Sequence, residues 1–172
     1  MAWKRPRREL MSLLWMPSSI VQQIALYIPV AKDFLSFLAS FPDVTSLGDL
    51  QYFLELSYDL RPIDLWPKLQ LDELTASLVP SVRRITRFFT TIYVLEMFDL
   101  KLLQQCLHPH NVVELLKCPT WIMNGLEEWL TTPISILPVQ HMTICRMSNV
   151  ICLLFLDQLG SMPHLVSLSL ES

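Results

Sequence analysis

The side chains best suited to chemistry gather between residues 106 and 118, where Cys106, His108, His110 and Cys118 stand. Thiolate and imidazole groups are the usual ligands of zinc in proteins. The spacing of these four residues matches no standard zinc module, however, and Pro109 separates the two histidines. We therefore expect no metal site and no cofactor.

Catalytic motifs are missing from the chain. There is no G-x-S-x-G or H-E-x-x-H sequence, and three glycines are too few for a loop that cradles phosphate. The adjacent acids at 72–73 and 127–128 point apart on a helix, so neither pair suggests an acid and a base acting together. His108 or His141 has the chemistry to activate a cysteine, but nothing in the sequence selects either one. We expect a non-catalytic protein.

The composition is unusually apolar, with 52% hydrophobic and 17% charged residues. The longest apolar run, residues 150–156, is far shorter than the ~20 residues of a membrane-spanning helix. The basic tail at residues 1–12 is followed by too short an apolar stretch for a signal peptide.

A net charge of −3 argues against general affinity for nucleic acids. The four cysteines form no disulfide framework. We expect a cytoplasmic or nuclear chain without a membrane span.

The basic tail leaves three interpretations open. It is a solvated tail, a nuclear-import signal, or, because this N-terminus contains tryptophan, a peripheral contact with a membrane surface. Lipid binding that is lost on deletion of residues 1–15 would identify the last of these.

Two short helices are expected between residues 16 and 41. Met16-Pro17 begins the first, and its apolar residues Ile20, Ile24 and Ile28 follow at helical spacing until Pro29 ends it. A second helix is expected to open on Asp33-Phe34-Leu35 and to continue through Leu38. Such short helices cannot bury this much apolar surface between themselves, so it faces either the core of the same domain or a partner.

The ordered pattern of these residues resembles an F-box, the helical module that joins a substrate receptor to a cullin–RING ubiquitin ligase. The family often has an acidic residue where Ser19 stands, and its basic-aromatic ending is missing after Leu38. Asp64-Leu65-Trp66 is similar to the closing leucine-tryptophan pair of that family, displaced by a helix expected at about residues 46–58. The resemblance implies that the ligase adaptor subunit is contacted by Pro17, Ile20, Ile24, Ile28, Phe34, Leu38 and Trp66.

An internal repeat follows. Segments 113–118, 139–144 and 165–170 share the spacing L-x-x-L-x-L at intervals of 26 residues, and a fainter copy stands at 85–90. Amphipathic helices are expected between them, at 95–107, 121–130 and 148–159. This pattern resembles the leucine-rich repeat. In such a stack the residues beside the inward leucines line one face of the sheet, so we expect substrate contacts from Lys117, Thr143, Ser169 and Glu171.

Together these patterns predict a mainly α chain with short parallel strands. A basic tail (1–12) precedes an F-box-like helical module (13–66) and a short, incomplete leucine-rich-repeat solenoid (67–172). No polar capping repeat follows residue 170, so we expect either a fragment or a stack that ends against a partner. The expected function is that of a substrate receptor, which binds the ligase adaptor, through it a cullin, and an unknown protein target. The alternative is a leucine-rich scaffold that binds other proteins and has no link to a ligase.

Overall fold

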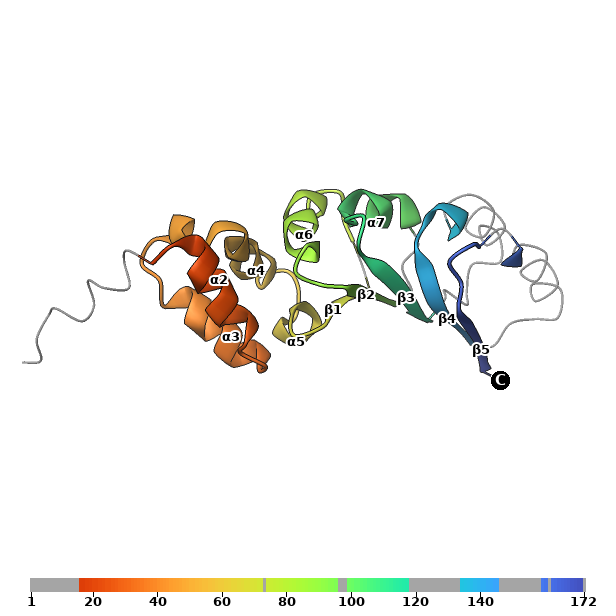
Figure 1. The fold of residues 1–172 in the computed structure, drawn as a ribbon, viewed down its shortest axis with the longest axis horizontal. Coiled ribbons are helices and arrows are strands. Elements are labelled where there is room, and N and C mark those ends of the chain that lie inside the picture. Colours follow the sequence, from red (N-terminus) through yellow and green to blue (C-terminus); the bar gives the residue numbers. More distant parts are fainter. Residues whose placement is uncertain are drawn as a thin grey trace, which may run out of the picture. The chain divides into compact units, whose positions relative to one another are not determined.

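The computed structural model describes residues 16–72, 74–95, 99–117, 134–145, 159–160 and 162–171. The chain divides into two compact units, Met1–Pro67 and Lys68–Ser172. We call them unit 1 and unit 2 and describe each by itself (Figure 1). Helices and a parallel sheet are both present, so the architecture is mixed α/β rather than mainly α.

Unit 1 is helical in its described part. Its elements are α2 (Ser18–Leu26), α3 (Ala31–Ala39), the 3₁₀ segment η1 (Val44–Leu50), α4 (Gln51–Leu56) and α5 (Pro62–Leu65). Pro17 precedes the first turn of α2 with extended backbone, and α2 ends before Pro29, which has no N–H to continue the helix. Asp33 lies inside the first turn of α3 rather than at its start.

The core of unit 1 is built around three aromatic rings. Phe34 stacks on Trp66 with ring centroids 4.5 Å apart, and Phe53 meets Phe34 edge-on at 5.0 Å. The indole N–H of Trp66 donates a hydrogen bond of 2.6 Å to the carbonyl oxygen of Ile28. Helices α3, α4 and α5 and the turn after α2 are therefore joined at one point.

Gly48 allows η1 to pass close to α2. Its φ of +58° and ψ of −133° belong to a region that side chains with a Cβ rarely adopt, and a Cβ there would meet Gln22 Nε2 at 2.8 Å. We expect Gly48→Ala to lower the free energy of unfolding of unit 1 by about 1–3 kcal/mol. Urea unfolding would measure this loss, and an unchanged midpoint would show that η1 shifts without strain.

Unit 2 contains a five-stranded sheet in which every strand is parallel to its neighbours. The order is β1 (Leu69–Leu71), β2 (Thr91–Leu95), β3 (Val112–Lys117), β4 (Val139–Cys145) and β5 (Ser167–Glu171). Parallel neighbours need crossover connections. Helices α6 (Val79–Thr86) and α7 (Leu100–Cys106) lie in the first two, and the short 3₁₀ turn η2 (Ile134–Ile136) precedes β4. Figure 1 shows α6 and α7 along the same side of the sheet.

One face of the sheet carries the core of unit 2. Leu71, Val94, Leu115 and Met142 are paired in register across β1 to β4, and each is at most 2% exposed. A second row of buried side chains joins Leu69, Ile92, Val113 and Val139. Alternate residues point to the other face, except in β4, where the register shift adds one residue between Val139 and Met142.

Three of the strand segments expected from the repeat overlap β3, β4 and β5, and the one expected at 165–170 begins two residues before β5. The faint copy at 85–90 is wrong, because Ile85 lies in α6 and β2 begins at Thr91. Val82 and Ile85 are both buried at helical spacing, so the same apolar pattern serves a helix there. The helix expected at 95–107 is shorter, because Leu95 ends β2 and α7 begins at Leu100. The helix expected at 121–130 lies outside the described residues, and so does all of the helix expected at 148–159 except its last residue.

Candidate partner-binding surfaces

Helix α2 presents three different faces. Val21 and Ala25 are fully buried in the core of unit 1. Ser18 and Gln22 lie against η1, where Gln22 Nε2 is 3.4 Å from the carbonyl oxygen of Leu47. Successive residues of an α-helix are turned by about 100°. The remaining face of α2 therefore lies on the side of the helix that is turned away from η1.

That third face is apolar and exposed. Its side chains are those of Ile20 (45% exposed), Ile24 (41%) and Tyr27 (88%), which we call the α2 stripe. Scattered exposed apolar residues are ordinary, whereas a row along one helix face makes α2 a candidate contact surface. Pro17 is also exposed at the start of the helix, and Ile28 is half-buried beyond its end.

Phe34, Leu38 and Trp66, the other residues that the F-box resemblance assigns to the adaptor, are core residues. Phe34 and Leu38 are 0% exposed and Trp66 is 6% exposed. A side chain buried to this extent offers almost no surface to a partner. These residues hold α2, α3 and α5 together. Substituting one of them would therefore affect binding only by changing the shape of unit 1.

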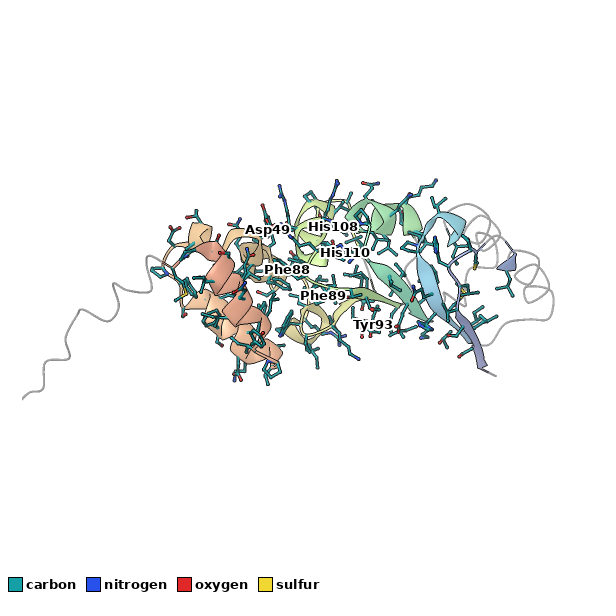
Figure 2. All side chains as sticks on the ribbon, viewed as in Figure 1. Asp49, Phe88, Phe89, Tyr93, His108 and His110 are labelled. Atoms are coloured by element: carbon teal, nitrogen blue, oxygen red, sulfur yellow. The ribbon has the colours of Figure 1, made fainter. Side chains whose placement is uncertain are left out.

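A second surface lies on the face of the sheet opposite to its buried side chains. Register pairing places one residue from each strand in a continuous row, which we call the outer row: Gln70, Tyr93, Glu114, His141 and Ser167. Ser167 is exposed and the other four are partly exposed. Tyr93 lies on the side of the sheet away from α6 and α7 (Figure 2).

Polar contacts organise the outer row. The Lys68 ammonium lies 5.1 Å from the centre of the Tyr93 ring, and His141 Nδ1 is 2.6 Å from Ser167 Oγ. The row thus combines an aromatic ring, a carboxylate, an imidazole and a hydroxyl on a surface with regular spacing. This is a hydrogen-bonding surface rather than an apolar one.

The four substrate residues expected from the sequence are only partly brought together. Thr143 and Ser169 are paired across β4 and β5, and Glu171 is paired with Cys145 at the end of the same strands. Lys117 is paired with Leu95 on β2 instead. The sequence did not predict the outer row, because β1 and β2 were not expected and because a register shift between β3 and β4 places Glu114 opposite His141.

The cysteine and histidine cluster does not form a metal site in the described structure. Cys106 is buried, with its sulfur 3.8 Å from the carbonyl oxygen of Val79, whereas His108 Nε2 lies 3.1 Å from the carbonyl oxygen of Arg83. The rings of His108 and His110 are 5.8 Å apart (Figure 2). Cys118 lies outside the described residues. Among the residues described, no three His, Cys, Asp or Glu side chains are grouped to hold an ion.

Cys106 makes the stability of unit 2 depend on pH in the alkaline range. Burial raises the pKa of its thiol from the ordinary 9.0 to about 12, although the Arg83 charge acts in the opposite direction. Between these two values the unfolded chain loses the thiol proton while the folded chain keeps it. We therefore expect the free energy of unfolding of unit 2 to fall as the pH rises above 9.0. Urea unfolding on both sides of that pH should show a smaller fall for Cys106→Ala, and equal falls would contradict this.

Asn111 joins successive crossovers of unit 2. Its side chain donates to the carbonyl oxygens of Thr86 (3.0 Å) and Phe89 (2.7 Å) and accepts from the His108 N–H at 2.6 Å. Asn111 is 2% exposed, so water cannot replace these three hydrogen bonds. The segment after α6 is therefore fixed to the start of β3.

We expect Asn111→Ala to lower the free energy of unfolding of unit 2 by about 2–4 kcal/mol, because it removes three hydrogen bonds made by a side chain that is 2% exposed. Hydrogen exchange followed by mass spectrometry should show faster exchange in 79–117 and no change in 18–56. Gln104→Ala removes an exposed amide from α7 and is the matched control. Equal exchange in both variants would show that the Asn111 contacts do not stabilise the fold.

No helix among the described residues is long and apolar enough to cross a membrane. Comparisons of the chain with known protein families, with curated proteins and with solved structures find no match.

Proposed function

We propose that this chain is a substrate-receptor subunit of a cullin–RING ubiquitin ligase. In this proposal unit 1 is an F-box-like module that binds the ligase adaptor subunit through the α2 stripe. Unit 2 is a leucine-rich-repeat-like array that presents the outer row to a protein target. No chemistry by the chain itself is involved, since such a receptor only brings the target to the ligase.

The observation that carries this proposal is the division of α2 into a buried face and an exposed apolar face. Val21 and Ala25 alone anchor the helix in the core, while Ile20 and Ile24 remain more than two-fifths exposed. The residues of the F-box pattern at 20 and 24 are thus on the accessible side of the helix. Burying each such side chain against a partner contributes about 1.5–3 kcal/mol.

The strand spacing supports the repeat interpretation of unit 2. Register partners are separated by 23 residues between Leu69 and Ile92 and by 21 between Ile92 and Val113. The separation is 26 residues both from Val113 to Val139 and from Met142 to Leu168. Leucine-rich repeats are about 20–29 residues long and add one parallel strand per repeat in chain order.

The segment after Leu38 favours the scaffold alternative. Helix α3 ends at Ala39, and Ser40 and Phe41 stand where the F-box family has its basic-aromatic ending. If adaptor binding requires that ending, the α2 stripe serves another protein. Co-purification of the full chain with the adaptor subunit separates the two functions. A stable complex supports the receptor, and its absence supports the scaffold.

A further inference from the structure

The outer row of unit 2 brings an aromatic ring and a carboxylate together. Tyr93 on β2 and Glu114 on β3 are register partners, and both side chains are partly exposed. Neighbouring strands of a sheet are about 4.8 Å apart, so one ligand group can touch both side chains. The face of an aromatic ring and a carboxylate each attract a cation.

A cation already lies on the Tyr93 ring. The Lys68 ammonium is 5.1 Å from the centre of this ring, which is within the range of a cation–π contact. Lys68 is exposed, and such a contact is weak at an exposed site. A ligand cation that makes a further contact can therefore replace the ammonium.

Glu114 offers that further contact. Among the described residues, no side chain is hydrogen-bonded to its carboxylate or forms an ion pair with it. His141, its register partner on β4, contacts Ser167 instead, with Nδ1 2.6 Å from Oγ. The oxygens of the Glu114 carboxylate are thus available to accept hydrogen bonds from a ligand.

An arginine side chain suits this pair of groups best. Its guanidinium is planar, so it stacks on an aromatic ring while its N–H groups donate to both oxygens of a carboxylate. A lysine ammonium is a compact charge without this planar shape. The net charge of −3 also attracts a basic partner and repels a polyanion such as a nucleic acid.

The outer row has the length of a short extended segment. Its five residues, from Gln70 on β1 to Ser167 on β5, span about 19 Å at about 4.8 Å per strand. Six residues in extended conformation reach about 20 Å. A segment that places an arginine between Tyr93 and Glu114 can therefore also reach the polar side chains of His141 and Ser167.

We infer that the outer row binds an arginine side chain of the protein target. The guanidinium stacks on Tyr93, pairs with the Glu114 carboxylate and takes the place of the Lys68 ammonium. This inference deepens the proposed function, on which it rests for the assignment of the outer row to the target. Lys68 is then a competitor that occupies the ring when no target is bound.

Nuclear magnetic resonance with ring-labelled tyrosine tests this site in the full chain. The chain has four tyrosines, and the signal that is missing from Tyr93→Leu identifies Tyr93. The probe is the peptide acetyl-Gly-Ser-Arg-Ser-Gly-amide, and the control peptide carries citrulline, an uncharged isostere, in place of arginine. We expect the arginine peptide to shift the Tyr93 signal saturably and the citrulline peptide to leave it unchanged. Tyr27 (88% exposed) and Tyr58 (90%) report non-specific contact and should not shift.

Three variants then locate the contacts. Glu114→Gln keeps the shape of the side chain and removes its charge, so it should weaken binding of the arginine peptide about two- to fivefold. Asp59→Asn removes an exposed carboxylate from unit 1 and is the matched control, which should bind like the parent chain. Lys68→Gln removes the competing ammonium and should tighten binding about twofold.

Three results would overturn the inference. The first is an equal shift of Tyr93 by the arginine and citrulline peptides. The second is equal weakening by Glu114→Gln and Asp59→Asn, or a shift of Tyr27 and Tyr58 as large as that of Tyr93, which would indicate general attraction to an acidic chain. The third is a shift of Tyr93 by a glutamate peptide alone, which would show that the row binds anions.

Titration with the adaptor subunit separates this site from the proposed function, because adaptor binding is assigned to unit 1. Arginine binding at Tyr93 without adaptor binding would support the site and contradict the receptor. Adaptor binding without a shift of Tyr93 would support the receptor and contradict the site.

Discussion

Phe34→Ala should unfold unit 1 under conditions in which the parent chain is folded. Phe34 is fully buried, stacks on Trp66 and meets Phe53 edge-on. Replacing such a ring with alanine leaves a cavity and costs about 3–5 kcal/mol. This is a large part of the 5–15 kcal/mol by which a typical domain is stable.

Hydrogen exchange would locate the loss. In Phe34→Ala, we expect faster exchange throughout 18–56 and unchanged exchange in 79–117, because the two units are compact separately. Phe37→Ala is the matched control, since Phe37 lies three residues further along α3, is only partly buried and meets Phe41 edge-on. Equal effects of the two substitutions would contradict the central position of Phe34 in this core.

Much of unit 1 was predictable from the chain. Pro17 and Pro29 delimit α2, and apolar spacing predicts α2, α3 and the helical segment from η1 to α4. The sequence did not predict which face of α2 is buried. Isoleucines at 20, 24 and 28 form the more hydrophobic row, but the core uses Val21 and Ala25. Contacts distant in sequence, with η1 and the aromatic cluster, decide this choice.

In unit 2 the sequence predicts some strands and not others. The repeats at 113–118 and 139–144 predicted β3 and β4 well, because those strands keep the apolar spacing. Strand β1 has only three residues, too few for a periodic pattern. The sequence therefore predicted a mainly α chain, whereas the architecture is mixed α/β. The structural role of Asn111 could not be predicted from the sequence. Its three hydrogen-bond partners are backbone groups up to 25 residues away.

The central claim, that the α2 stripe binds the ligase adaptor, is tested most directly by the double variant Ile20→Asp/Ile24→Asp. Both side chains are on the exposed apolar face, so charging them should leave the unfolding of unit 1 nearly unchanged. Losing the burial of two apolar side chains costs a partner contact about 3–6 kcal/mol. That corresponds to at least a hundredfold loss of affinity, enough to abolish a micromolar complex.

The measurement is a calorimetric titration of the adaptor subunit into the full chain and into two variants. Ser19→Asp/Gln23→Asp is the control, because it adds the same charges to α2 at the same spacing but outside the stripe. The account predicts binding by the parent chain and the control, and none by Ile20→Asp/Ile24→Asp. Absence of binding by the parent chain, or equal binding by all three proteins, would contradict it.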